Sequence, residues 1–226
     1  MNFDSLAPYY YRIEWFFAGN RLQRCRTALL HSIPKPGHVL ILGEGNGRFL
    51  SAFLKAHPAA KVTCVEGSAR MMKLARERLM HDGIDPEVVN WIQVDAMEWQ
   101  PPVGQYDLVI TLFFLDCFRP EQLAVLIPKL AAAATPSAHW LLSDFREPAS
   151  GLARWRARFA LWVLYRFFRW VTRLSASHLT SPDVFLENAG FVLGERRLQE
   201  WGLLHSDLWK RGDQQKTPSS EGVSLP

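Results

Sequence analysis

The chain has 226 residues, of which 48% are hydrophobic and 21% are charged, and its formal net charge is +4. This size and composition predict one globular domain with room for a small appendage. No run of 18 uncharged residues occurs and the N-terminus lacks the pattern of a signal peptide, so we expect no membrane-spanning helix. The three cysteines (Cys25, Cys64 and Cys117) are odd in number and too far apart for a zinc knuckle, which favours reduced thiols in a cytoplasmic protein without a metal site.

Residues 1–37 are expected to form a helical cap ahead of the first strand. Aromatic residues crowd positions 9–17, helical periodicity follows at 21–30, and Pro34-Lys35-Pro36-Gly37 ends the segment. These aromatic side chains either fold over a ligand-binding edge of the sheet or pack against its side. Packing is the simpler interpretation for most of them, and Tyr10 is the exception.

A glycine-rich turn at Gly43, Gly45 and Gly47 separates a predicted strand at 38–42 from a predicted helix at 47–56. The strand is apolar from 39 to 42, as in a parallel sheet that is buried on both faces. Strand, glycine turn and helix are typical of a nucleotide-binding α/β unit, because glycine permits positive φ and lets a ligand approach the backbone. The dinucleotide fingerprint requires glycine at its sixth position, where this chain has Arg48.

Carboxylates follow the next two predicted strands. The strand at 60–66 ends in Glu66, and the strand at 90–96 contains Asp95 near its end. A carboxylate at the end of the second strand is able to accept both ribose hydroxyls of a nucleotide. The carboxyl ends of parallel strands lie at one edge of a sheet, so both acids are expected beside the glycine turn.

The remaining elements continue the alternation of strands and helices that is typical of an α/β fold. They are helices at 68–81 and 120–134, strands at 106–114 and 138–144, a short helix at 181–189, and a hairpin of strands at 191–199 and 203–209. From residue 211 onward, the polar composition predicts a disordered tail.

Taken together, these motifs resemble the class I S-adenosylmethionine-dependent methyltransferases, whose motif I has the same G-x-G-x-G spacing. The segment Phe3-Asp4-Ser5-Leu6-Ala7-Pro8-Tyr9-Tyr10 resembles the F-D-x-x-A-x-x-Y opening of ubiquinone/menaquinone C-methyltransferases and their type 11/12 relatives. The resemblance implies a Rossmann-like, seven-stranded, mostly parallel sheet over residues 38–210, with a terminal antiparallel hairpin and helices on both faces. It also implies S-adenosylmethionine as cofactor and S-adenosylhomocysteine as product.

Through this resemblance, cofactor contacts are expected at the glycine turn, at the ends of strands two to four and at the N-terminal tyrosine. The residues are Gly43, Glu44, Gly45, Asn46, Gly47, Glu66, Gly67, Ser68, Asp95, Ala96, Leu112, Phe113 and Tyr10. The chain departs from the family where motif I normally has an acid two residues before its first glycine, because that position is Ile41. We hypothesise that Glu44, inside the turn, faces the ammonium group of the cofactor instead; otherwise the affinity is expected to be weak.

The segment that follows the fourth predicted strand indicates which kind of molecule accepts the methyl group. Methyltransferases that act on DNA bases or on glutamine have an (Asn/Asp/Ser)-Pro-Pro-aromatic signature after it, whereas this chain has Leu112-Phe113-Phe114-Leu115-Asp116. This difference argues against a nucleic acid or protein amide and favours an apolar pocket with one carboxylate. A base is needed only if the acceptor must lose a proton, and the candidate catalytic residues are Asp116 and Tyr10, with Asp144 and His178 as further options.

A basic and aromatic helix is predicted at residues 152–174. Five arginines occupy one arc of it, and apolar residues occupy the opposite side. Two interpretations remain open: the apolar face covers the sheet while the arginines are solvated, or the helix lies on a membrane surface. The arginines are Arg154, Arg158, Arg166, Arg169 and Arg173.

These features predict a cytoplasmic enzyme that transfers a methyl group to a small, lipophilic acceptor such as a quinone precursor or a lipid. A peripheral position at the inner membrane face is one interpretation of its basic helix. Two alternatives remain. One is a nicotinamide-dependent reductase of similar fold, and the other is a non-catalytic module that docks to a membrane or a partner. A nucleic-acid partner is not expected.

Overall fold

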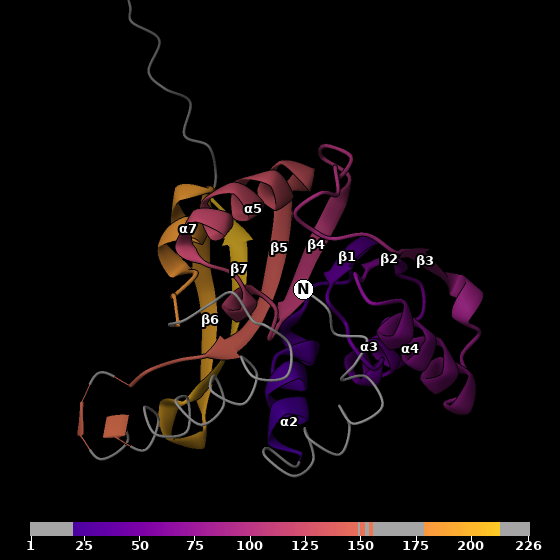
Figure 1. Ribbon diagram of the computed structural model, residues 1–226, viewed down its shortest axis with the longest axis horizontal. Helices are drawn as coiled ribbons and strands as arrows, with labels where there is room; N and C mark the ends of the chain where they lie inside the picture. The colour runs from indigo at the N-terminus through magenta and orange to yellow at the C-terminus, as the bar shows by residue number, and fades with distance from the viewer. Residues whose placement is uncertain (1–19, 149, 152–153, 156–178, 213–226) are drawn as a thin grey trace, which may run out of the picture.

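The computed structural model describes residues 20–148, 150–151, 154–155 and 179–212, which form a seven-stranded sheet with helices on both faces (Figure 1). The order of the strands is β3-β2-β1-β4-β5-β7-β6. The strands are β1 (His38–Leu42), β2 (Lys61–Val65), β3 (Val89–Ile92), β4 (Tyr106–Leu112), β5 (Ala134–Phe145), β6 (Phe191–Gln199) and β7 (Leu204–Arg211). The first five strands are parallel and β7 is antiparallel to both of its neighbours, which confirms the predicted architecture.

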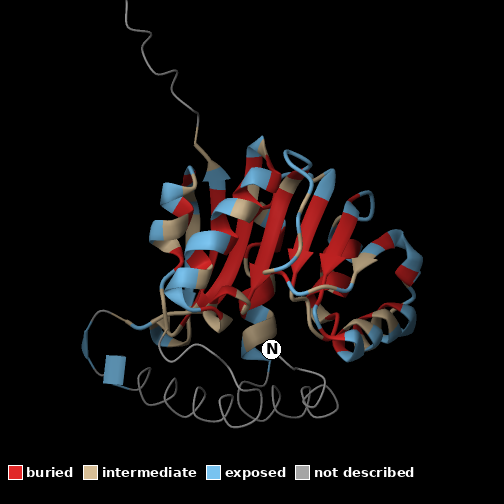
Figure 2. Cartoon of the chain, turned by 45° about the horizontal axis from the view of Figure 1, so that its top comes forward, coloured by how far each residue is buried: buried red, intermediate tan, exposed pale blue. Residues whose placement is uncertain are grey.

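The helices divide between the two faces of the sheet according to the alternation of side chains along the strands. On β1, Leu40 and Leu42 belong to the same core cluster as α5, whereas Val39 and Ile41 belong to the cluster of α3. The helices are α2 (Arg21–Thr27), α3 (Arg48–Ala56), α4 (Ala69–His81), α5 (Pro120–Ala133) and α7 (Asp183–Asn188). Figure 2 shows that buried residues follow the strands, while the outer sides of the helices are exposed.

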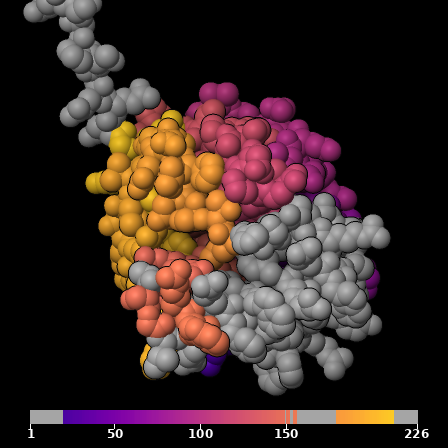
Figure 3. All heavy atoms as spheres, turned by 60° about the vertical axis from the view of Figure 1, so that its left-hand side comes forward, coloured from indigo at the N-terminus to yellow at the C-terminus, as the bar shows by residue number. Residues whose placement is uncertain are grey.

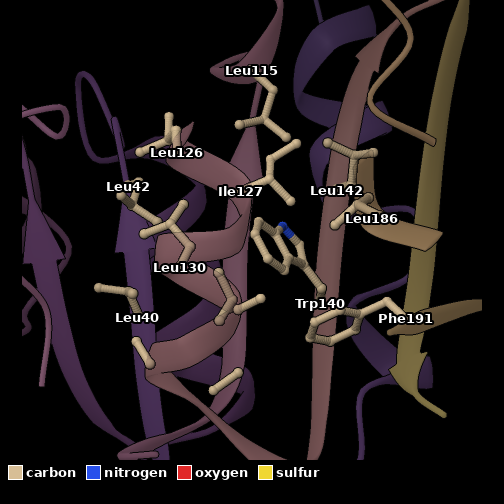
Figure 4. Packing of buried hydrophobic residues seen from close by; sticks show 14 of the residues in the cluster. Leu40, Leu42, Leu115, Leu126, Ile127, Leu130, Trp140, Leu142, Leu186 and Phe191 are labelled. Carbon is tan, nitrogen blue, oxygen red and sulfur yellow. The ribbon is translucent and has the colours of Figure 1, made fainter. Parts of the chain in front are cut away.

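The core on the α5 face is organised around Trp140 of β5 (Figure 4). Its ring packs edge-on against Phe191, with 5.4 Å between the ring centroids. Its indole N–H donates to the Thr111 hydroxyl at 2.8 Å, which satisfies the one polar group of the side chain. Strands β4, β5 and β6 are thereby held together beneath α5 and α7.

Some predicted boundaries differ from the observed ones. β3 ends at Ile92, and the predicted strand residues through 96 leave the sheet in a turn that the Asp95 carboxylate caps. β5 begins at Ala134, four residues before the predicted start, because Tyr106 of β4 pairs with it there. Arg211, predicted to open the tail, belongs to β7, where its guanidinium lies 5.3 Å from the Phe191 ring centroid.

Several predictions concern residues outside the described part of the chain. These are the opening segment with Tyr10, most of the helix at 152–174, His178, and the tail from 213 onward. Among the described residues, no helix combines the length and apolarity that crossing a membrane requires.

The order of the strands places the candidate site. From β1, the chain continues to β2 and β3 on one side of β1 and then returns to β4 on the other side of β1. The direction in which strands are added to the sheet therefore reverses between β1 and β4. Ligands of open α/β sheets bind outside the carboxyl ends of the strands at such a point. The ends of β1, β2, β3 and β4 carry the residues that the sequence singled out.

Candidate functional site

The three glycines of the turn after β1 all have positive φ, but they differ in what surrounds them. A Cβ atom on Gly43 would lie 2.3 Å from the Phe114 ring, and one on Gly47 would lie 2.7 Å from the Cα atom of Ala75. A Cβ atom on Gly45 would meet nothing within 4 Å. Two of the glycines therefore permit close packing within the protein, and only Gly45 borders open space where a ligand has room to approach.

Glu66, which follows β2, holds the glycine turn against the start of α4. Its Oε2 accepts the Gly45 amide at 3.2 Å, and its Oε1 accepts the Ser68 amide at 2.9 Å. The Ser68 side chain in turn caps α4 by accepting the Met71 amide at 3.1 Å. These two bonds fix the position of the Glu66 carboxylate beside Gly45.

Two further predicted residues lie at the same edge. Asn46 is 7% exposed, and its Nδ2 has no hydrogen-bond partner within the part of the chain that the structure describes. Asp95 is exposed after β3, with Oδ1 accepting the Met97 amide at 2.9 Å, and Ala96 beside it is buried. Gly67 lies between Glu66 and Ser68. The structure thus brings the predicted residues of the first three strand ends together.

Glu44 lies inside the glycine turn and caps the following helix. Its Oε1 accepts the Leu50 amide at 2.9 Å and the Phe49 amide at 3.1 Å, at the positively polarised start of α3. Burial raises the pKa of Glu44 to about 7, although these amides and the nearby Arg26 lower it. Among the described residues, no partner is found for its Oε2. The carboxyl is therefore positioned within the turn and retains one oxygen for a cation.

Arg26 of α2 is a site residue that the sequence interpretation missed. Its side chain is only 6% exposed, and its guanidinium lies 5.3 Å from the centroid of the Phe113 ring. Its charge also acts on Glu44 of the glycine turn. A buried arginine beside the turn adds a cation that is suited to a carboxylate. Helical periodicity alone did not distinguish it from the exposed arginines of the same helix.

The segment after β4 supplies aromatic rings and a carboxyl. Leu112 ends the strand, and Phe113 adopts φ 54°, with its amide donating to the Ser143 carbonyl at 2.7 Å. The Phe113 ring lies 5.1 Å from that of Phe145, which follows β5. Positive φ at a bulky residue is a strained conformation that often marks a functional site.

Asp116 lies in the short 3-10 helix η3 (Leu115–Cys117), close to Asp144 at the end of β5. Burial raises the pKa of Asp116 to about 6. Burial also raises the pKa of Asp144 well above its ordinary value, and the charge of Asp116 raises it further. Asp144 is 1% exposed, and no described residue bonds its Oδ2. Two buried carboxyl groups that influence each other therefore lie at this edge of the sheet, where β4 and β5 end.

The observed groups fit S-adenosylmethionine. Gly45 leaves the backbone open, Glu66 is positioned for the ribose, and Asn46 has an unused donor. Arg26 and Glu44 offer one cation and one carboxyl for the amino acid part of the cofactor. Within the described ranges, no group of three or more His, Cys, Asp or Glu side chains is arranged to hold a metal ion.

The raised pKa of Glu44 predicts how the free energy of unfolding depends on pH. The folded chain holds this proton up to about pH 7, whereas the ordinary value is 4.5, so the free energy of unfolding falls as the pH rises between these values. The variant Glu44→Gln keeps an oxygen for the two amides without the charge. We expect it to be more stable than the wild type by about 3 kcal/mol at pH 8, since each pKa unit corresponds to about 1.4 kcal/mol, and equal to it at pH 4. Urea unfolding at both pH values measures this, and a difference that does not change with pH contradicts the prediction.

Known sequences that are similar to this chain are methyltransferases. A family model described as a methyltransferase domain matches residues 39–137. The chain is 26% identical over 153 residues to a ubiquinone/menaquinone biosynthesis C-methyltransferase of Pseudomonas paraeruginosa, and 30% identical over 154 residues to a trans-aconitate 2-methyltransferase of Azoarcus sp.. These matches cover 66% and 64% of this chain, but 59% and 56% of the two relatives. The chain thus spans less than two thirds of the length of these relatives.

Known structures have the same fold. Mitomycin 7-O-methyltransferase superposes with a TM-score of 0.68 at 18% identity, over 94% of this chain and 61% of its own. The 1,6-didemethyltoxoflavin-N1-methyltransferase of Burkholderia thailandensis, with its substrate and S-adenosylhomocysteine bound, superposes with a TM-score of 0.63 at 18% identity. That match covers 92% of this chain and 86% of the other. At such identities, the likeness establishes the fold.

Proposed function

We propose that this chain is a class I S-adenosylmethionine-dependent methyltransferase, as the match of residues 39–137 to a methyltransferase domain supports, and that it transfers the methyl group of S-adenosylmethionine to a small, lipophilic acceptor. The observation that carries this proposal is the open backbone at Gly45 next to the positioned Glu66 carboxylate, at the carboxyl edge of the sheet. The same comparisons favour it over a nicotinamide-dependent reductase or a non-catalytic module.

Holding the cofactor is the first task of the proposed site. Glu66 would bind the ribose hydroxyls, and Asp95 and the Ala96 backbone would bind the adenine. Glu44 would meet the ammonium group through Oε2, and Arg26 would meet the carboxylate. When bound, S-adenosylmethionine supplies an activated methyl group with a good leaving group. The chain then has to orient the acceptor and exclude water.

The acceptor side of the site combines aromatic rings with carboxyl groups. Phe113 and Phe145 contact each other there, and Phe114 packs against Phe118 with 5.0 Å between the ring centroids. Asp116 lies between Phe114 and Phe118 in the sequence, in the 3-10 helix that follows β4. Such surroundings suit an aromatic or aliphatic acceptor with one polar group, such as a quinone precursor or a lipid. The name of one relative refers to ubiquinone and menaquinone biosynthesis, which supports an acceptor of this class.

We also propose that the chain meets a membrane surface through its basic helix. Arg154 and Trp155 are exposed, Trp155 to 78%, and Arg154 forms an ion pair with Glu147 at 2.7 Å. Exposed arginine and tryptophan suit a lipid headgroup region. The other arginines, Arg158, Arg166, Arg169 and Arg173, lie outside the described residues.

Asp116 is proposed to orient the acceptor, and this role is testable. In the variant Asp116→Asn, we expect methyl transfer to an organic-soluble acceptor to fall about tenfold or more, because a positioned hydrogen-bonding carboxyl is lost. Binding of S-adenosylhomocysteine is expected to remain within about twofold of the wild type. Labelled methyl transfer and calorimetric titration measure the two quantities. The exposed Asp85→Asn is the matched control, and an unchanged rate in Asp116→Asn rules out this role.

A further inference from the structure

A buried chain of charged and polar side chains lies beside the proposed acceptor site, and no step described so far uses it. The Nδ1 atom of His205 lies 2.9 Å from Oδ2 of Asp207, two residues further along β7. Arg196 of β6 donates to both oxygens of Asp207, at 2.8 and 2.6 Å, and also to Asp183 of α7 at 2.8 Å. The segment 179–212, orange to yellow in Figure 3, places β6 and α7 beside α5 on the surface. His205 is 2% and Asp207 0% exposed.

This arrangement selects one tautomer of the neutral imidazole. Burial alone would raise the pKa of Asp207, but hydrogen bonds from Arg196 and His205 keep it below its ordinary value. Asp207 is therefore an anion that accepts a hydrogen bond from Nδ1 of His205. Because a neutral imidazole has one donor and one acceptor nitrogen, Nε2 is left as the acceptor. Among the described residues, no partner is found for Nε2.

The position of His205 in the sheet puts it at the proposed site. β7 is antiparallel to β5, so its first residues lie at the edge where β4 and β5 end. His205 pairs with Asp144, the buried acid whose Oδ2 has no described partner. Side chains paired in this way point to the same face, with Cβ atoms about 5 Å apart. Helix α2 links this point to the cofactor side, because Cys25 donates to the His205 carbonyl at 3.2 Å and the adjacent Arg26 reaches Phe113.

The neighbouring acids are less suited to take a proton. Asp116 accepts the Cys117 thiol at 3.6 Å, and hydrogen bonds from its own amide and that of Cys117 occupy two more of its roughly four lone-pair sites. Burial favours the protonated form of Asp144. Three titratable side chains adjoin His205 directly: Asp144, which pairs with it on β5, Asp207 on β7, and Cys25 on α2, which donates to its carbonyl. Arg196 and Asp183 continue the chain of ion pairs from Asp207, and the charges of Asp116 and Cys117 lie beyond, near Asp144.

We propose that the acceptor atom is a hydroxyl oxygen and that His205 takes its proton during methyl transfer, with Asp207 and Arg196 as positioning residues. This inference rests on the proposed methyltransferase function. In the step, the O–H bond breaks and its proton forms an N–H bond at Nε2. The oxygen electron pair forms the O–CH3 bond as the S–CH3 bond breaks, and a neutral thioether leaves. Asp144 bonds a second hydroxyl, so an acceptor with two adjacent hydroxyls fits best.

The test compares two catechols of different acidity at pH 8, using 4-tert-butylcatechol and 4-nitrocatechol with labelled S-adenosylmethionine. The first is un-ionised and needs a base, whereas the second is already largely ionised. In His205→Gln, we expect the rate with 4-tert-butylcatechol to fall about 100-fold and the rate with 4-nitrocatechol to fall less than about fivefold. Both rates come from one preparation, so a loss of folded protein cancels in their ratio.

The matched control is His139→Gln, which alters a histidine five residues before Asp144 on β5 and is expected to leave the ratio unchanged. Equal losses with both catechols in His205→Gln would assign His205 a structural role and overturn the proposal. A wild-type protein that binds S-adenosylhomocysteine but methylates neither catechol would also overturn it, while leaving the proposed function standing. If S-adenosylhomocysteine does not bind at all, the proposed function itself fails.

Discussion

The variant Glu66→Ala is expected to bind S-adenosylhomocysteine about 100-fold more weakly than the wild type. Two ribose hydroxyls bonded to a carboxylate contribute about 1.5 kcal/mol or more each, and a loss of about 3 kcal/mol corresponds to this factor. The same carboxylate also holds the Gly45 and Ser68 amides, so its removal loosens the glycine turn as well. Isothermal titration with S-adenosylhomocysteine measures the affinity.

The control for this variant is Glu77→Ala on α4. Glu77 is half-exposed and forms only a long ion pair with Lys73, at 3.9 Å, so its removal is expected to leave the affinity unchanged. Thermal unfolding of both variants checks that each is folded. If Glu66→Ala binds S-adenosylhomocysteine as tightly as the wild type does, the ribose is not held by this residue.

Two glycine variants are expected to separate folding from binding. In Gly47→Ala, the new Cβ atom meets Ala75 at 2.7 Å and the residue must keep φ 80°. Strain costs about 1–2 kcal/mol and overpacking about 1–3 kcal/mol, so the free energy of unfolding falls by about 2–5 kcal/mol. In Gly45→Ala, only the strain applies, because the Cβ atom meets nothing.

Guanidinium unfolding of the two ligand-free variants measures this difference. Titration with S-adenosylhomocysteine then reveals the opposite order, since Gly45→Ala occupies ligand space and is expected to lose at least about tenfold in affinity while it stays folded. Equal destabilisation in the two variants would mean that the packing around Gly47 does not distinguish it from Gly45.

The part of the fold that follows from local pattern was predictable. Buried parallel strands are apolar throughout, and each is followed by a turn and an amphipathic helix, so the order of elements was readable. Glu66 was singled out by its distance along the chain from the glycine turn, and Asp95 by its place at the exit of the third strand, where the resemblance implies an acid. Boundaries such as those of β3 and β5 depend on pairing partners, which the local sequence does not contain.

The missed residues owe their roles to contacts between distant segments. Arg26 looks like its exposed neighbours until α2 is packed against the sheet, and His205 and Asp207 look like the outer face of a hairpin. A signal was nevertheless present. Leu203-Leu204-His205-Ser206-Asp207-Leu208-Trp209 places polar residues within an apolar strand, which indicates a buried polar network.

The glycine turn shows a different limit. Its spacing predicted a ligand site, but spacing does not reveal which glycine faces the ligand and which faces the protein. The structure assigns the protein-facing role to Gly43 and Gly47 through Phe114 and Ala75. Similarly, the pattern placed Glu44 inside the turn, whereas its bonds to the start of α3 depend on how the turn folds.

The most direct test of the central claim is to incubate the protein with methyl-labelled S-adenosylmethionine and a bacterial extract, and to separate organic-soluble, aqueous and macromolecular fractions. We expect label in the organic fraction, and none when the Glu66→Ala variant replaces the wild type. Label confined to the aqueous or macromolecular fraction would contradict a lipophilic acceptor. No transfer to any fraction, by a protein that also fails to bind S-adenosylhomocysteine, would contradict methyl transfer itself.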